Sequence, residues 1–137
     1  MGSSLSQSIY YAKNIVAAGA GANTVTVQFS LAAAFPDIRI LEYRGVSAVD
    51  VTAGASGTGT ATSSGAVTTS TANELLFAAN TVATGNTAAG AGFTARIITT
   101  PDLDLVEDQV VNTTGSYTAT APIAPSGAWV MQIVAFR

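Results

Sequence analysis

The sequence predicts an all-β domain: an antiparallel β-sandwich of jelly-roll or immunoglobulin-like type, with about nine short strands. Polar and apolar residues alternate in TVTVQF, where Val25, Val27 and Phe29 are each preceded by a polar residue, and this period of two is typical of a half-buried strand. Thr, Ser and 13 Gly residues are abundant, as expected for pleated surfaces joined by turns. The 3.6-residue apolar stripe of a helix is missing from the sequence.

The expected strands follow one another at short intervals. They are Ser8–Lys13, Thr24–Phe29, Asp37–Tyr43, Ala66–Thr69, Glu74–Ala79, Phe93–Thr99, Leu105–Val111, Ser116–Ala121 and Trp129–Arg137. The connectors between them are rich in Gly or Pro, which is typical of turns. One of these connectors, GASGTGTATSSG, resembles a phosphate-binding loop only superficially, because it lacks the following Lys-Ser/Thr pair and a helix. We therefore expect a flexible connector there.

The three expected strands between Phe93 and Ala121 are predicted to form a meander with one apolar face. Val106 and Ala119 lie on that face, whereas Leu105 and Glu107 lie on the opposite, mixed-to-polar face. Asp108 is the one charged residue that this pattern places on the apolar face. The pattern also places Arg96 diagonal to Glu107 on the polar face.

The last expected strand is apolar on both faces. Trp129, Met131 and Ile133 point one way, while Val130 and Val134 point the other way with Phe136. A second cover must then come from a loop, from another subunit or from a part of the domain outside this chain. We expect self-association into a homo-oligomer, through the outer face of Trp129–Phe136 or through an exposed strand edge.

The length and charge of the chain indicate a single domain and argue against two functional classes, nucleic-acid binding and membrane insertion. With 137 residues and a net charge of −3, the chain fits a single domain over residues 5–137. The sequence lacks a basic run, so nucleic-acid binding is not expected. Its apolar runs are shorter than the roughly 20 residues that cross a bilayer, so membrane insertion is not expected either. Residues 1–4 (MGSS) are typical of residues appended for expression and are left out of the fold argument.

Catalysis is not expected, and no catalytic residue is assigned. The chain has no His and no Cys, which removes the commonest general base and the thiol nucleophile. Glu42 and Asp108 are the carboxylates set within apolar strands, and a glycoside hydrolase would need such a pair. The alternative is that each carboxylate pairs with an arginine, Arg39 or Arg96, or faces solvent.

The stretch PDLDLVED holds four of the eight acidic residues of the chain. Asp102, Asp104 and Asp108 are candidate ligands for a structural Ca²⁺ ion, since Ca²⁺ binds six to eight oxygen atoms. The EF-hand pattern fails, because Glu107 stands where that loop requires Gly. The competing interpretation is a solvated hairpin tip. We expect no cofactor, and we expect that metal is dispensable.

Aromatic residues provide the candidate ligand-binding positions Tyr10, Tyr11, Tyr43 and Trp129. Sandwich modules hold sugars by stacking a pyranose ring on such side chains. Adjacent Tyr10 and Tyr11 point to opposite sides of an extended strand, so one of them is expected to face outward. Packing in the core or in an interface is the alternative for all four.

The succession IYYAKNI, NTVTVQFS, PDIRILEYRGV, NELLFAA, GAGFTARIITTPDLDLVEDQVV, TGSYTATA and SGAWVMQIVAFR resembles a β-sandwich module that is repeated in large secreted bacterial proteins, often beside immunoglobulin-like domains. The resemblance covers Leu5 to Arg137. It implies an extracellular or cell-surface, non-catalytic module of structural or adhesion type, with carbohydrate binding as the alternative function and a hydrolase as a distant third. Such modules carry further strands before the segment matching IYYAKNI, so the resemblance also implies the C-terminal part of a longer unit.

Overall fold

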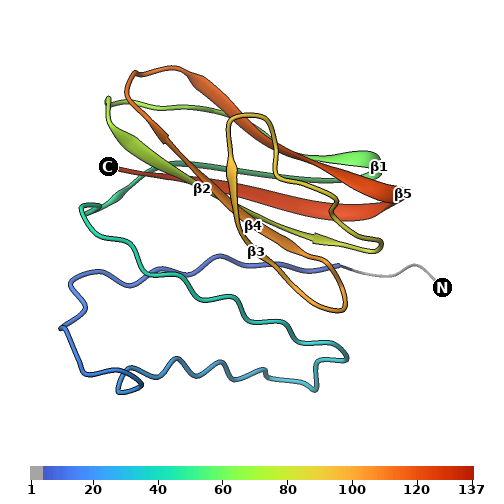
Figure 1. The fold of residues 1–137 in the computed structure, drawn as a ribbon, viewed down its shortest axis with the longest axis horizontal. Coiled ribbons are helices and arrows are strands. Elements are labelled where there is room, and N and C mark those ends of the chain that lie inside the picture. The colour runs from blue at the N-terminus through green and yellow to red at the C-terminus, as the bar shows by residue number, and fades with distance from the viewer. Residues whose placement is uncertain (1–4) are drawn as a thin grey trace.

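The computed structural model describes residues 5–137, and these residues form an all-β structure without a helix, as the sequence predicts. Residues 1–4 lie outside the described part. Five strands make one antiparallel sheet in the order β1-β5-β2-β4-β3 (Figure 1). Their bounds are Val49–Thr68 (β1), Glu74–Val82 (β2), Thr94–Ile98 (β3), Leu105–Val111 (β4) and Ser116–Phe136 (β5). The described residues contain no helix that is long and apolar enough to cross a membrane.

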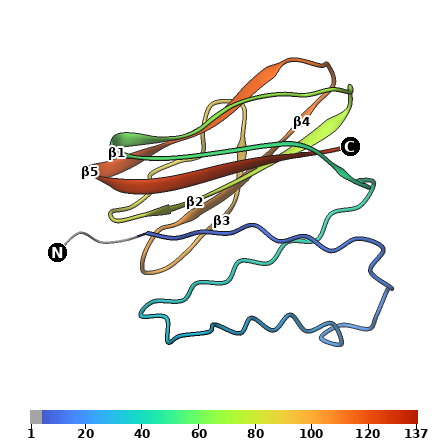
Figure 2. The same cartoon turned by 180° about the vertical axis from the view of Figure 1, so that it is seen from behind.

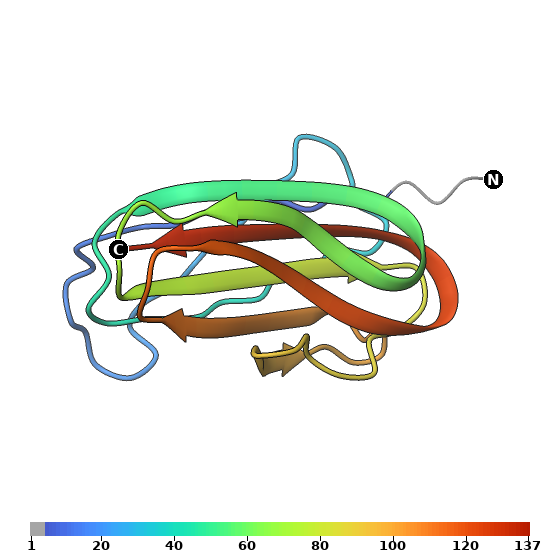
Figure 3. The same cartoon turned by 90° about the horizontal axis from the view of Figure 1, so that it is seen from above.

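The two longest strands, β1 and β5, form a ribbon that folds back over the sheet. Gly59 pairs with Gly127, and after a register shift Ala61 pairs with Pro122. Figure 3 shows both strands turning at the same end, so that the later half of β1 and the earlier half of β5 lie above the sheet. We call this overlying part, residues 61–68 and 116–122, the folded ribbon.

The structure corrects two expectations in this region. GASGTGTATSSG belongs to β1 and is not a connector, and the expected strands Ser116–Ala121 and Trp129–Arg137 are parts of one strand, β5. Gly57 shows why glycine is used inside β1: a Cβ atom there would lie 2.6 Å from atom Cζ2 of the Trp129 ring. The glycine admits a large side chain on the neighbouring strand and does not mark a turn.

An apolar core lies between the sheet and the folded ribbon, with buried polar residues such as Thr62 and Asn80 in the same layer. Leu76, Ile133 and Met131 are fully buried on the sheet side, and Val67 and Ala119 close the core from the ribbon side. These side chains face one another because residues at every second position of a strand share one face. We call the side of the sheet under the ribbon the ribbon face and the opposite side the outer face.

Strand β4 has the predicted bounds, but its neighbours differ from the predicted meander. It pairs with β2 and β3, whereas β5 pairs with β1 and β2. Residues 105–108 of β4 are buried, so both faces of the strand are covered there. Leu105 and Glu107, expected on a mixed-to-polar face, are fully buried on the ribbon face, whereas Val106 and Asp108 are buried on the outer face. The expected diagonal between Arg96 and Glu107 is also wrong, because Arg96 pairs with Asp108.

Residues 5–48 run back and forth across the outer face of the sheet (Figures 1 and 2). The expected strands Ser8–Lys13, Thr24–Phe29 and Asp37–Tyr43 do not form, since residues 5–48 contain no hydrogen-bonded strand. The period of two nevertheless persists in two places. Residues 5, 7 and 9, and again residues 39, 41 and 43, are half-buried, while the residues between them are exposed. The segment is extended and is attached through its side chains.

The outer face of the last strand thus receives a cover from within the chain. Val134 is buried at 8% exposure. The Phe136 ring meets the Tyr11 ring edge-on, with 5.8 Å between the ring centroids. Residues 5–11 therefore provide the second cover that the two apolar faces of Trp129–Phe136 require. Self-association remains a prediction, with an exposed strand edge as the alternative surface.

Candidate functional site

Arg39 is the centre of a polar cluster between residues 5–48 and the outer face. Its Nη1 atom donates to the carbonyl oxygens of Asn80, at 2.8 Å, and Leu105, at 3.1 Å. Its Nε atom lies 3.1 Å from Asp37 Oδ2, and Nη2 lies 3.8 Å from Asp104 Oδ2. One guanidinium group thereby joins the N-terminal segment to strands β2 and β4.

Gln7 provides the second attachment in this cluster. Its Nε2 atom donates to the Ala79 carbonyl at 2.9 Å and to Gln132 Oε1 at 3.2 Å. Its Oε1 atom accepts hydrogen bonds from Thr81 Oγ1 at 3.1 Å and from Arg39 Nη2 at 3.4 Å. The polar groups of the cluster therefore satisfy one another, which is typical of a structural contact.

The acidic turn after β3 lies beside this cluster. Leu103 adopts a φ of 58° at the position where Gly would be usual in a tight turn. Thr99 Oγ1 donates to Asp102 at 2.5 Å, and the Val82 N–H donates to Asp104 Oδ1 at 2.8 Å. Burial raises the pKa of the Asp104 carboxyl, although the Val82 hydrogen bond and the Arg39 charge oppose this shift.

The predicted set of metal ligands is only partly brought together. Carboxylate oxygens of Asp37, Asp102 and Asp104 lie within 4.8 Å of one another, but Asp108 belongs to a different cluster. Arg39 already contacts two of the three carboxylates and supplies the positive charge that a Ca²⁺ ion would bring. The donor set therefore does not fit a resident cation unless Arg39 moves away.

Asp108 is the centre of a second cluster, and the structure selects the arginine pairing for it. Arg96 Nε lies 2.8 Å from Asp108 Oδ2, and the Tyr43 hydroxyl donates to the same oxygen at 2.7 Å. Burial, together with Asp108, raises the pKa of Tyr43 far above its ordinary value. The Tyr43 ring also meets the Phe77 ring edge-on at a centroid distance of 6.2 Å.

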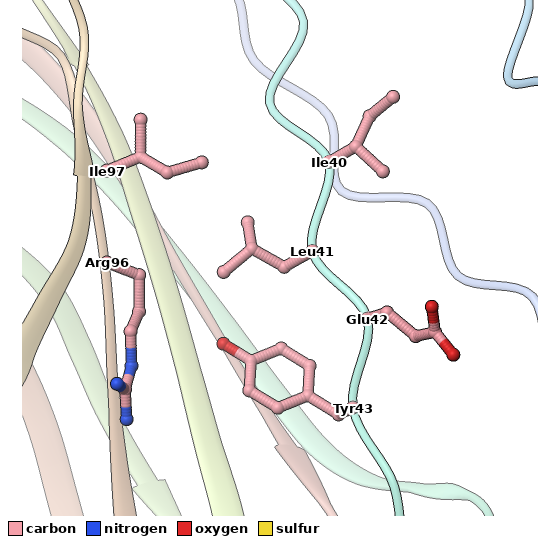
Figure 4. Close-up of a pocket in the computed structure, with 6 residues that line it drawn as sticks. All are labelled: Ile40, Leu41, Glu42, Tyr43, Arg96 and Ile97. Carbon is pink, nitrogen blue, oxygen red and sulfur yellow. The ribbon is translucent and has the colours of Figure 1, made fainter. Parts of the chain in front are cut away.

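An open groove of about 530 Å³ lies beside this cluster, lined by Ile40, Leu41, Glu42, Tyr43, Arg96 and Ile97 (Figure 4). In Figure 4 the Glu42 carboxylate points away from Arg96 and from the Tyr43 hydroxyl. Glu42 is exposed, and Asp108 is buried by its partners. The two carboxylates that a glycosidase would use therefore do not face a common substrate position.

Glu107 is a buried carboxylate on the ribbon face that the sequence pattern placed on a polar surface. Its exposure is 0%, and Oε2 accepts a hydrogen bond from the Gly90 N–H at 2.7 Å. Among the described residues, Oε1 has no hydrogen-bond partner. Burial raises the pKa of Glu107 to about 7, and the Gly90 hydrogen bond offsets only part of that shift.

The four aromatic candidates do not form one platform. Tyr10 is 88% exposed. The Tyr11 ring contacts the Phe136 ring edge-on, and the Tyr43 hydroxyl donates to Asp108 on the outer face. Trp129 packs against the apolar core on the ribbon face. As expected, one of the adjacent tyrosines faces outward more than the other. Tyr10 alone keeps a fully open ring.

Sequence reasoning missed the roles of Gln7 and Arg39 as attachment points, although it considered Arg39 as a partner for carboxylates. The signal for Arg39 was present: a lone cation between Ile38 and Ile40, in an extended apolar stretch, needs acceptors when it is half-buried. Gln7 offered no comparable signal. Searches of family models, curated proteins and solved structures find no match to the chain.

Proposed function

We propose that the chain is a non-catalytic, extracellular module of structural or adhesion type, built as a β-sandwich in which residues 5–48 cover the outer face of the sheet. It acts by binding other chains. The observation that carries this proposal is the apolar outer surface of residues 10–40. Phe35 is 98% exposed and Leu31 83%, and Val25 and Phe29 are at least half exposed. Extracellular placement rests on the sequence resemblance.

This surface differs from the scattered exposed apolar residues of ordinary proteins, because it gathers in one extended segment. Apolar and polar residues alternate along Val25, Val27 and Phe29, and all of residues 24–29 are exposed, as in a strand that lacks a covering layer. The polar clusters, in contrast, point inward and satisfy one another. The exposed side chains of the described residues thus favour adhesion through apolar contacts over acid–base catalysis.

Light scattering tests the proposal at micromolar concentration. We expect the natural chain to associate, and the triple variant Val25→Thr, Phe29→Thr, Phe35→Ser to lose the association that this segment provides, because Thr keeps the extended backbone while it reduces apolar area. Val110→Thr is the matched control, since Val110 is 68% exposed on β4. A natural chain that stays monomeric, or a triple variant that associates as before, contradicts the proposal.

Carbohydrate binding is the second candidate, and the open ring of Tyr10 favours it. A polysaccharide pull-down or a glycan array, repeated with Tyr10→Ala, tests this function. Loss of binding in Tyr10→Ala but not in Tyr11→Ala would support it, because Tyr11 is engaged with Phe136. Absence of binding to every glycan leaves the adhesion module as the proposal.

A further inference from the structure

The two edges of the sheet, β3 and β1, differ in their protection against pairing. Strand β3 has five residues, and its register shifts between Ala95 and Ile97. It also carries the charged Arg96. Short length, an irregular register and charge are the devices by which natural edge strands avoid other chains.

Strand β1 has none of these devices in residues 52–59, because its charged Asp50 and its register shift between Val49 and Thr52 lie before them. It is 20 residues long, and the stretch Val51–Asn73 contains no charged residue and no Pro. Its register against β5 is regular from Thr52 to Gly59. On the other side β1 has no neighbour in the sheet of the described residues, and Figure 3 shows it along the border of the sheet. A long row of unpaired backbone groups lies at this border.

We propose that residues 53–59 of β1 pair antiparallel with the same residues of a second copy, which joins the two sheets edge to edge around Ser56. The inference rests on the proposed function as a module that associates with other chains, and it names one partner and one mode of contact. A free edge of this kind is completed by another β-strand, because only a strand matches its spacing of donors and acceptors.

The sequence of β1 indicates that the partner strand is a second copy of itself. Antiparallel self-pairing around Ser56 places Gly54 opposite Thr58, and no like charges meet. Asp50 lies outside the paired stretch. The exposed side chains along β1 are small, so two copies approach without steric conflict. Because the other edge is protected, each copy offers one open edge, and the pairing closes as a two-fold dimer instead of growing into a fibre.

Single-cysteine variants test this arrangement cleanly, since the natural chain has no Cys. Ser56→Cys places the two thiols opposite each other across the two-fold axis, and mild oxidation is expected to yield a disulfide-linked dimer. Thr94→Cys, exposed on the protected edge β3, is the matched control and is expected to yield several-fold less dimer. Equal cross-linking of the two variants overturns the proposal.

A second variant separates this inference from the proposed function. Ser56→Lys places two like charges opposite each other at the axis, so the weight-average mass is expected to fall by half or more while circular dichroism stays unchanged. If Ser56→Lys leaves the mass unchanged and the Val25/Phe29/Phe35 variant abolishes association, the pairing through β1 is wrong and the adhesion proposal stands. A natural chain that is monomeric in both assays overturns both.

Discussion

Glu107 and Asp108 are neighbours on β4, yet they lie in opposite environments. Glu107 points to the ribbon face, has an exposure of 0% and meets only the Gly90 N–H. Asp108 points to the outer face and is held by Tyr43 and Arg96. The difference between the two carboxylates reflects a difference between the two layers that cover the sheet. The folded ribbon lies on the face of Glu107, and residues 5–48 lie on the face of Asp108.

The folded ribbon is held by backbone pairing, by an apolar core and by buried hydrogen bonds such as the one that Asn80 Nδ2 donates to Thr62 Oγ1. The cover formed by residues 5–48 is held by a few polar side chains, chiefly Arg39, Gln7 and Tyr43. A core loses stability in proportion to the apolar area that is removed, whereas a polar attachment fails when one partner is lost and the remaining groups stay buried. We therefore predict that loss of core contacts under the folded ribbon unfolds the whole sheet. Loss of a polar attachment on the outer face releases only residues 5–48.

Ile133→Ala is expected to have the largest effect, because Ile133 is fully buried under the ribbon. The lost contacts and the cavity should reduce the free energy of unfolding by about 3 kcal/mol. Urea denaturation measures the change. Val110→Ala, at a position that is 68% exposed, should change it by less than about 0.5 kcal/mol. Similar values for the two variants would mean that the ribbon face holds no real core.

Arg39→Ala should release residues 5–48 while the sheet stays folded. The substitution leaves the carbonyls of Asn80 and Leu105 without their side-chain donor and Asp104 without its cation, at a cost of about 2 kcal/mol to the attachment of the segment. Hydrogen exchange should accelerate in residues 5–48 but not in β2 or β5. Arg44→Ala, at an exposed position, is the control. Global unfolding of Arg39→Ala would mean that the two covers are one cooperative unit.

The sequence predicted β2, β4 and the edge strand β3 well and the other edge strand, β1, poorly. Strand β4 was predicted with its observed bounds, because apolar and acidic residues mark it off from the Gly- and Pro-rich turns. Only the end of strand β1 was predicted, as Ala66–Thr69, since the Gly, Ser and Thr residues before it have the composition of a connector. Only the packing of Trp129 on Gly57 shows why a strand needs glycine there. Such contacts between distant residues leave no local periodicity.

The contacts of the candidate site were likewise predicted only in part from the sequence. Pairing of Asp108 with Arg96 was among the alternatives, because both residues lie on neighbouring expected strands. The inclusion of Asp37 in the acidic turn was not foreseen, since 65 residues separate Asp37 from Asp102 in the sequence. Glu107 was assigned to the wrong environment because its burial on the ribbon face, where the Gly90 N–H reaches it, was not expected.

The raised pKa of Glu107 predicts that acid stabilises this side of the sheet. Its pKa is about 7 in the folded state against an ordinary value of 4.5, so the folded protein binds more protons between these values. Stability from this group is therefore greatest below pH 4.5 and is lost as the pH rises through 7, by about 2 kcal/mol after allowance for solvent screening.

Glu107→Gln removes the charge and keeps the shape, so it should flatten the pH dependence and stabilise the protein at pH 8. Thermal melts between pH 5 and pH 8 measure the effect. Glu42→Gln, which removes an exposed carboxylate, should leave the profile unchanged. An unaltered slope in Glu107→Gln would show that water reaches the ribbon face.

The smallest expected effect is that of Ca²⁺ on the natural chain. Asp37, Asp102 and Asp104 are close enough to share a cation, but Arg39 supplies the positive charge in their midst. Adding millimolar Ca²⁺ or a chelator should therefore change the Tm by less than about 1 °C. Arg39→Gln removes that charge while it keeps a polar side chain, so Ca²⁺ should stabilise this variant measurably, and the further change Asp102→Ala should cancel the gain. A chelator-induced fall of several degrees in the natural chain, reversed by Ca²⁺ and absent in Asp102→Ala, would show instead that the carboxylates hold an ion despite the arginine, and that the outer cover depends on metal as well as on its polar attachments.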